Sequence, residues 1–163
     1  MSAFLHGLVP TGLPGTIAVA LIALLAGSAT VRGAETPSVS APSAEATALQ
    51  PVRAEIKAKK YDAALAELKV LVTKYQSADV YTLMGHALWK TGDPANGMIY
   101  YNKALALNPL HRGALEYQGE LYVALGQVDK AKENLAKLKG VCPFSCEEYS
   151  DLKEAIDRPA KGS

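Results

Sequence analysis

The two cysteines, Cys142 and Cys146, are the side chains of this 163-residue sequence best suited to chemistry. A thiolate can act as a nucleophile, as a redox group or as a metal ligand. Thiol oxidoreductases place two residues between their paired cysteines, within a strand-rich pattern, whereas Pro-Phe-Ser separates the cysteines of this chain. We therefore keep a thiol redox protein that uses Cys142 and Cys146 only as an alternative function.

The segment Gly85–Asp93, GHALWKTGD, raises a second chemistry, which is phosphate binding. A phosphate loop has a glycine directly before its lysine, so that several backbone N–H groups can converge on the phosphates. Here Trp89 precedes Lys90, and no continuous apolar strand leads into the segment. We therefore expect no nucleotide site.

The remaining candidate ligands and acid–base groups form no recognisable site. His86 and His111 have no cysteine or histidine at metal-ligand spacing, and no carboxylate pair or serine motif marks acid–base or nucleophilic chemistry. The sequence therefore predicts no enzyme, no metal site, no cofactor and no small-molecule substrate. A net charge of +1 gives no electrostatic reason to expect nucleic acid as a partner.

The apolar run Thr16–Gly27, TIAVALIALLAG, suits a signal peptide and is shorter than the roughly 20 residues that a membrane-spanning helix needs. Gly27 and Ala29 are small, as a cleavage site requires, which predicts a signal peptide over residues 1–29. The mature protein would be periplasmic or secreted, and an uncleaved N-terminal membrane anchor is the alternative. In an oxidising compartment, we expect the two cysteines to form a disulfide.

The next segment, residues 30–50, is rich in Pro, Ser, Thr and Ala and contains no aromatic side chain. Such a segment buries too little apolar surface to offset the entropy lost on ordering, which predicts a disordered linker. Residues 159–163 are expected to form a disordered tail. The folded domain is therefore predicted to span residues 51–158.

A repeat of 34 residues organises this domain, because a shift of that length aligns Gly85 with Gly119 and Gly92 with Gly126. Apolar residues recur at three- and four-residue steps within each unit, which predicts a helix, a turn and a second helix. Gly92 and Gly126 fall where the first helix should end, a place that favours positive φ. Gly85 and Gly119 fall inside the first helix, where we expect them to allow close backbone packing.

At these residues the chain resembles the tetratricopeptide repeat family, whose pattern is W-x2-L-G-x2-Y…A-x3-F…P. In one unit the matching positions are Tyr81, Met84, Gly85, Leu88, Gly97, Tyr101, Ala104 and Pro109. In the next they are Leu115, Gln118, Gly119, Tyr122, Ala131, Leu135, Leu138 and Pro143. The resemblance implies an all-α helix-turn-helix solenoid of about two and a half to three repeats. Its units would be residues 51–77, 78–111 and 112–145, followed by a C-terminal capping helix, 146–157.

The resemblance also implies a function, because the first helices of tetratricopeptide repeats line a concave groove that holds a partner protein or peptide. The positions of these helices not used for packing are Thr82, His86, Trp89, Lys90, Glu116, Glu120 and Val123. Trp89 is the favoured anchor, since aromatic groups often carry binding energy, and packing of Trp89 against the upstream unit is the alternative. The predicted function is a non-catalytic protein-interaction module of the periplasm or cell envelope. The alternative is a structural protein that self-associates.

Overall fold

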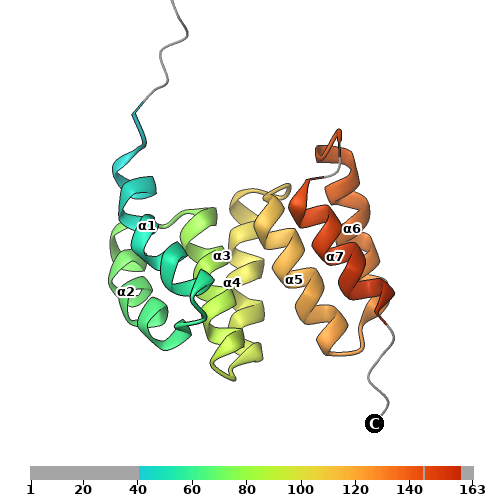
Figure 1. Ribbon diagram of the computed structural model, residues 1–163, viewed down its shortest axis with the longest axis horizontal. Helices are drawn as coiled ribbons and strands as arrows, with labels where there is room; N and C mark the ends of the chain where they lie inside the picture. The colour runs from blue at the N-terminus through green and yellow to red at the C-terminus, as the bar shows by residue number, and fades with distance from the viewer. Residues whose placement is uncertain (1–40, 145, 159–163) are drawn as a thin grey trace, which may run out of the picture. The chain divides into compact units, whose positions relative to one another are not determined.

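The structure, a computed structural model, describes residues 41–144 and 146–158. These residues form seven α-helices and no strand, which confirms the predicted all-α class (Figure 1). The helices are α1 (Ala44–Lys57), α2 (Tyr61–Lys74), α3 (Ala78–Lys90), α4 (Pro94–Leu107), α5 (Arg112–Ala124), α6 (Val128–Val141) and α7 (Glu147–Asp157). None of these seven helices combines the length and apolar character needed to cross a bilayer. The predicted signal peptide, 1–29, and the predicted tail, 159–163, lie outside the described residues.

The first helix, α1, begins well before Pro51 and extends into the predicted linker, 30–50. Ser43 caps this helix, because its Oγ accepts a backbone N–H at 3.0 Å. Leu49 and Val52 lie on one face of the helix and are buried. Burial of this apolar face outweighs the hydrogen bond that a proline inside a helix removes. The predicted domain boundary at Pro51 is therefore wrong, and the end of the predicted linker is helical.

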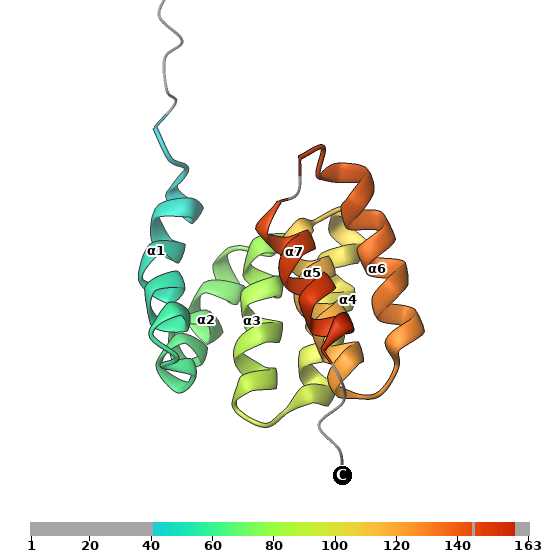
Figure 2. The same ribbon diagram turned by 45° about the vertical axis from the view of Figure 1, so that its right-hand side comes forward.

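The helices form hairpins that stack in a row. The first helices of successive hairpins contact one another, and the second helices do not. α1 packs on α2, α3 on α4 and α5 on α6, while α7 packs on both α5 and α6. The odd-numbered helices also contact one another in order, from α1 to α7. Figure 2 shows α7 lying over α5 at the side of the molecule away from α1. Among the described residues, no even-numbered helix packs on another. The odd-numbered helices thus form one inner layer, which α2, α4 and α6 flank as separate helices.

Small residues allow the helices to approach closely, as the repeat predicted. A Cβ added to Gly85 in α3 would lie 2.9 Å from the carbonyl oxygen of Gly97 in α4. The same added atom would lie 2.7 Å from the ring of Tyr101, which is fully buried. Gly119 in α5 has the same role toward α7, since its Cβ would lie 2.6 Å from the methyl carbons of Leu152. The glycines inside the first helices are therefore packing residues.

The turns between the helices of each repeat require glycine for a different reason. Gly92 has a φ of +95° and Gly126 a φ of +73°, conformations that side chains of L-residues disfavour. After the first of these turns, the Asp93 side chain accepts the N–H of Asn96 at 3.1 Å and so caps α4. Pro94 is the first residue of α4, where its missing N–H has no cost. Each turn therefore reverses the chain at a position that the repeat pattern predicts.

Most of the apolar core belongs to two clusters, one in α1–α3 and one in α5–α7. The first cluster includes Leu49 of α1, Leu68 of α2 and Val80 of α3. The second includes Leu115 of α5 and Leu152 of α7, both fully buried. α7 thus covers the apolar side of the last hairpin, at the place predicted for a capping helix.

Candidate functional site

The inner layer is hollowed by a cavity of about 590 Å³, which we call the inner cavity. Its walls come from α1, α3, α5 and α7 and from the loop that joins α4 to α5. Two arginines, one histidine and five carboxylates are among its lining residues. The volume falls within the range of about 300–1,000 Å³ that is common for ligand pockets. The cavity is therefore large enough to hold side chains of a bound protein segment.

The wall formed by α1 and α3 has balanced charges. The Arg53 guanidinium donates to Oδ1 of Asp79 at 2.7 Å, and Nε2 of His111 lies 3.7 Å from the same oxygen. Nδ1 of His111 accepts the N–H of Ala114 at 3.2 Å, so the proton of the neutral ring lies on Nε2 and faces Asp79. His111 and Arg53 together hold the pKa of Asp79 at about 2, despite partial burial. Asp79 is therefore ionised at neutral pH, and its charge is matched.

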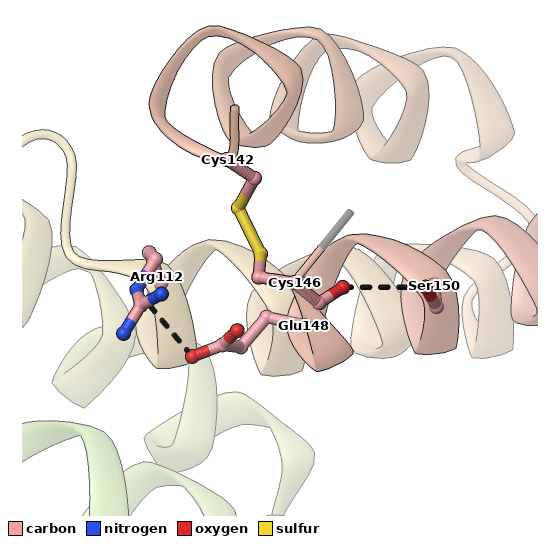
Figure 3. The surroundings of a disulfide bond; sticks show 5 residues. All are labelled: Arg112, Cys142, Cys146, Glu148 and Ser150. Atoms are coloured by element: carbon pink, nitrogen blue, oxygen red, sulfur yellow. Dashed lines mark hydrogen bonds and ion pairs between the residues drawn. A yellow bond between two sulfur atoms is a disulfide. The ribbon is translucent and has the colours of Figure 1, made fainter. Parts of the chain in front are cut away.

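The wall formed by α5 and α7 is acidic and has no matching set of cations. Arg112 lies at its edge and pairs with Glu148, with Nε and Oε1 3.5 Å apart (Figure 3). Glu116 is only 8% exposed, and no described residue forms a hydrogen bond or ion pair with its carboxyl group. Burial, reinforced by the charges of Glu120 and Asp151, raises the pKa of Glu116 to about 8. This carboxyl group is thus mostly protonated at pH 7.

Of the predicted groove residues, the structure brings Thr82 and Glu116 into the inner cavity. Both are buried. Lys90 is exposed and lines a separate hollow beside the start of α2. Glu120 is half-buried one turn beyond Glu116, and Val123 packs against the second apolar cluster. The predicted groove residues therefore do not form one continuous surface, because some line the cavity, some are exposed elsewhere and some pack in the core.

The other two predicted groove residues, His86 and Trp89, belong to an aromatic cluster. His86 is 6% exposed, and its ring centroid lies 4.1 Å from that of Tyr117 and 5.8 Å from that of Tyr61. Burial, followed by the nearby charge of Lys90, lowers the pKa of His86 to about 4. Trp89 is half-buried, and the Lys90 ammonium lies 3.7 Å from its ring centroid. Trp89 therefore keeps some exposed surface, whereas His86 is a neutral packing residue at pH 7.

The sequence prediction missed several residues that line the inner cavity. Asp79 lies three residues before Thr82 on α3 and could have been found by extending the same helical stripe toward the start of the helix. Arg53 and Asp151 come from α1 and α7, and their approach depends on packing between distant segments. No local spacing in the sequence points to them.

The two cysteines lie close together between the last two helices, beside the acidic wall. Cys142 follows α6 and Cys146 precedes α7, and their sulfur atoms lie 1.98 Å apart (Figure 3). The sulfur atoms and a carboxylate oxygen of Glu148 all lie within 4.8 Å of one another, a spacing that could hold a metal ion. Sulfur atoms that are bonded to each other offer no thiolate, so this trio lacks the ligands of a metal site in the bonded form.

The fold and the cavity define a class of protein, in which helical hairpins stack in a row and their first helices enclose a polar cavity. Two sequence models described as tetratricopeptide repeat match residues 78–109 and 114–145. The first range contains the hairpin α3–α4, and the second covers the hairpin α5–α6 from the third residue of α5 onward. These two hairpins are therefore tetratricopeptide repeats, which confirms the repeat that the sequence predicted.

A solved structure described as the crystal structure of MamA is similar to this chain, with a TM-score of 0.57 and 24% sequence identity. The match covers 69% of this chain and 66% of that chain, so this protein spans slightly less than two thirds of the length of MamA. At this identity the likeness supports the fold alone. No curated protein matches the sequence. Tetratricopeptide repeats are interaction or scaffold modules, and this is the class of function that the repeats support.

Proposed function

We propose that the protein is a non-catalytic interaction module that holds a segment of a partner protein in the inner cavity. The observation that carries this proposal is the hollow formed by the first helices of the two repeats, with buried polar groups in its walls. In stacked repeat proteins the curved inner surface is the one that binds partners. The predicted signal peptide supports action in the periplasm or outside the cell.

A photocrosslinking experiment tests where the partner binds. The crosslinking amino acid p-benzoylphenylalanine would replace Leu110, which lines the inner cavity and is 51% exposed. The matched control is Ile99 on α4, which is 50% exposed and lies outside the cavity. We expect the probe at position 110, and not at position 99, to capture a protein from the cell envelope fraction. Equal capture at both positions would contradict binding in the inner cavity.

Trp89 is a second proposed contact for the partner, although it does not line the inner cavity and is linked to the lining residue Tyr117 only through His86. Its half-buried ring offers apolar surface next to the Lys90 ammonium. Trp89→Ala should therefore reduce capture by the probe at position 110. Unchanged capture would remove Trp89 from the binding site and leave the inner cavity itself in place.

The location of the protein can be tested separately. Residues 1–29 carry the signal-like pattern, so we expect N-terminal sequencing of the protein from the envelope fraction to begin at Thr30. Recovery of the intact N-terminus in the membrane fraction would support an uncleaved anchor instead.

Self-assembly is a second candidate function, because apolar side chains are exposed on the even-numbered helices. Val70 of α2 is 69% exposed, and Ile99 and Leu107 of α4 are about half exposed. Such residues could join copies of the protein side by side. Sedimentation across a range of concentrations tests this role, and a mass that stays monomeric would exclude it.

We also propose that Cys142 and Cys146 form a structural disulfide in the mature protein. Cys142 at the end of α6 and Cys146 at the start of α7 have Cα atoms 5.4 Å apart, and this placement supports the role. Thiol titration of the native and the denatured protein should find no free thiol. Free thiols that react rapidly near neutral pH would support the redox alternative instead.

A further inference from the structure

The charges that line the inner cavity are unequal in number. Five carboxylates and two arginines line it, which is a formal excess of three negative charges when all are ionised. The whole chain has a net charge of +1, so this local excess is a property of the cavity and not of the composition. A positively charged group of a partner is therefore the kind of group that the cavity complements.

Both arginines are already engaged with other carboxylates. Arg53 donates to Asp79 at 2.7 Å, on the wall formed by α1 and α3. Arg112 lies at the edge of the acidic wall but pairs with Glu148 at 3.5 Å. The cavity therefore supplies no spare arginine to the other acidic side chains, which include Glu116.

Glu116 is the acidic residue whose surroundings indicate a missing partner. More than nine tenths of this residue is buried, its side chain lines the cavity, and no described residue forms a hydrogen bond or ion pair with it. A buried carboxyl group without a partner is costly, and it stays protonated until a cation compensates its charge. Every neighbouring charge that acts on the pKa of Glu116 raises it, from Glu120 on its own helix to Glu147, Glu148 and Asp151 on α7.

Tyr117 provides the apolar surface that a long basic side chain also needs. It follows Glu116 on α5 and lines the same cavity, and its ring is held in place by the His86 ring at 4.1 Å. Lysine and arginine bury their methylene groups along aromatic surfaces while their charged ends reach a carboxylate. The ring and the carboxyl group together therefore match one basic side chain.

We infer that the inner cavity binds a partner segment through a lysine or arginine whose charged end pairs with Glu116 and whose methylene groups lie against Tyr117. This inference rests on the proposed function and specifies the chemistry of the partner. When the cation binds, the carboxyl group of Glu116 ionises and its proton passes to the solvent. Binding at pH 7 therefore releases a proton, which an attraction between groups that are already charged does not do.

A selection from random peptides tests the inference without knowledge of the natural partner. Twelve-residue random peptides displayed on phage would be selected on the full chain, on Glu116→Gln and on Glu133→Gln. Glu133 is an exposed residue of α6 outside the cavity, so its variant is the matched control. We expect peptides selected on the wild type and on Glu133→Gln to be enriched in lysine and arginine. We expect this enrichment to disappear on Glu116→Gln.

Affinity and proton release are then measured with one selected basic peptide. Titration calorimetry in two buffers of different ionisation enthalpy should show release of most of one proton at pH 7 for the wild type and for Glu133→Gln. Glu116→Gln should bind the peptide about tenfold or more weakly and should release no proton. A thermal melt of each variant confirms that it is folded.

The outcomes separate this inference from the proposed function. Selected peptides that bind in the cavity without basic enrichment, or that bind Glu116→Gln equally well, would overturn the inference and leave the interaction role standing. Recovery of no peptide, together with equal crosslinking at positions 110 and 99, would overturn both. A crosslink from position 110 to residues 1–40 of the same chain, or to a second copy, would also overturn the inference, since the occupant would then not be a separate partner.

Discussion

The backbones of Gly85 and Gly97 touch across the hairpin α3–α4, and a Cβ on either residue would lie 2.9 Å from the carbonyl oxygen of the other. A backbone atom cannot move aside as the end of a side chain can. Gly85→Ala should therefore lower the free energy of unfolding by on the order of 2 kcal/mol, even though alanine favours helices. Chemical denaturation followed by circular dichroism measures this change.

The control for this prediction is Gly140 in α6, around which an added Cβ would meet no atom within 4 Å. Gly140→Ala should raise the stability by up to about 1 kcal/mol, because only the helix propensity changes. Gly119→Ala should have an intermediate effect, since its added Cβ meets the end of the Leu152 side chain. A similar change at Gly85 and Gly140 would show that close approach is not the reason for glycine in the first helix.

The stability of the fold should depend on pH through Glu116. Its pKa is raised from the ordinary 4.5 to about 8 in the folded protein, so the folded state binds the proton more tightly than the unfolded state. The free energy of unfolding should therefore fall as pH rises from 4.5 to about 8, by on the order of 3 kcal/mol after allowance for screening by solvent. Denaturation at a series of pH values should show that Glu116→Gln removes this loss.

His86 should act in the opposite direction, because burial lowers its pKa from 6.5 to about 4. The unfolded state then binds more protons between these values, and stability should fall as pH decreases from 6.5 to about 4. His86→Phe keeps an aromatic ring against Tyr117 and should remove this loss of stability at acid pH.

Between pH 4.5 and 6.5 the effects of His86 and Glu116 on the free energy of unfolding oppose each other. Glu116→Gln should therefore make the loss of stability at acid pH steeper. A parallel pH dependence in both variants would contradict these assignments.

The proposed disulfide should stabilise the end of the fold. A loop closed from Cys142 to Cys146 is short, and its closure contributes about 2 kcal/mol in the chain-entropy model. Reduction with dithiothreitol should lower the free energy of unfolding by about this amount and should speed proteolysis at α7 first, because Cys146 precedes that helix. The double variant Cys142→Ser, Cys146→Ser should match the reduced protein and should not respond to dithiothreitol.

The ion pair between Arg112 and Glu148 predicts a substitution that should increase the affinity of the inner cavity for a basic peptide. Arg112→Gln removes one of the two arginines of the cavity and frees Glu148. The selected peptide should then bind a few-fold more tightly at low salt, and the gain should shrink as ionic strength rises. Calorimetry at two salt concentrations measures both effects. Weaker binding would mean that Arg112 itself contacts the peptide.

The sequence predicted the parts of the fold that repeat, because close helix packing and tight turns demand small residues at fixed intervals. Gly85 and Gly119 mark the packing positions, and Gly92 and Gly126 mark the turns. The start of α1 was not predicted, since Pro51 is a frequent helix boundary but lies inside this helix. Pro51 lies inside the helix because α1 is buried against α2 and α3, and local sequence rules do not predict such tertiary packing.

The site was predicted only in part, for a related reason. The predicted groove residues on α3 and α5 include Thr82 and Glu116, and both of these line the inner cavity. The property that singles out Glu116 is the absence of a cation among the described residues around it, and this depends on acidic residues that α7 brings from farther along the chain. It also depends on the ion pair between Arg112 and Glu148. This pair results from tertiary packing and cannot be predicted from the spacing of the residues in the sequence.

The inner helices contact one another and the outer helices do not, and this difference affects how a chain of this kind can gain further hairpins. Because the odd-numbered helices touch in order while the even-numbered ones do not, each hairpin packs on the preceding one through its inner helix, which contacts both helices of that neighbour. A tandem duplication of one hairpin would therefore present surfaces that its new neighbours already fit. Growth in this manner ends at α7, whose Leu152 fits over Gly119 and whose exposed positions are polar.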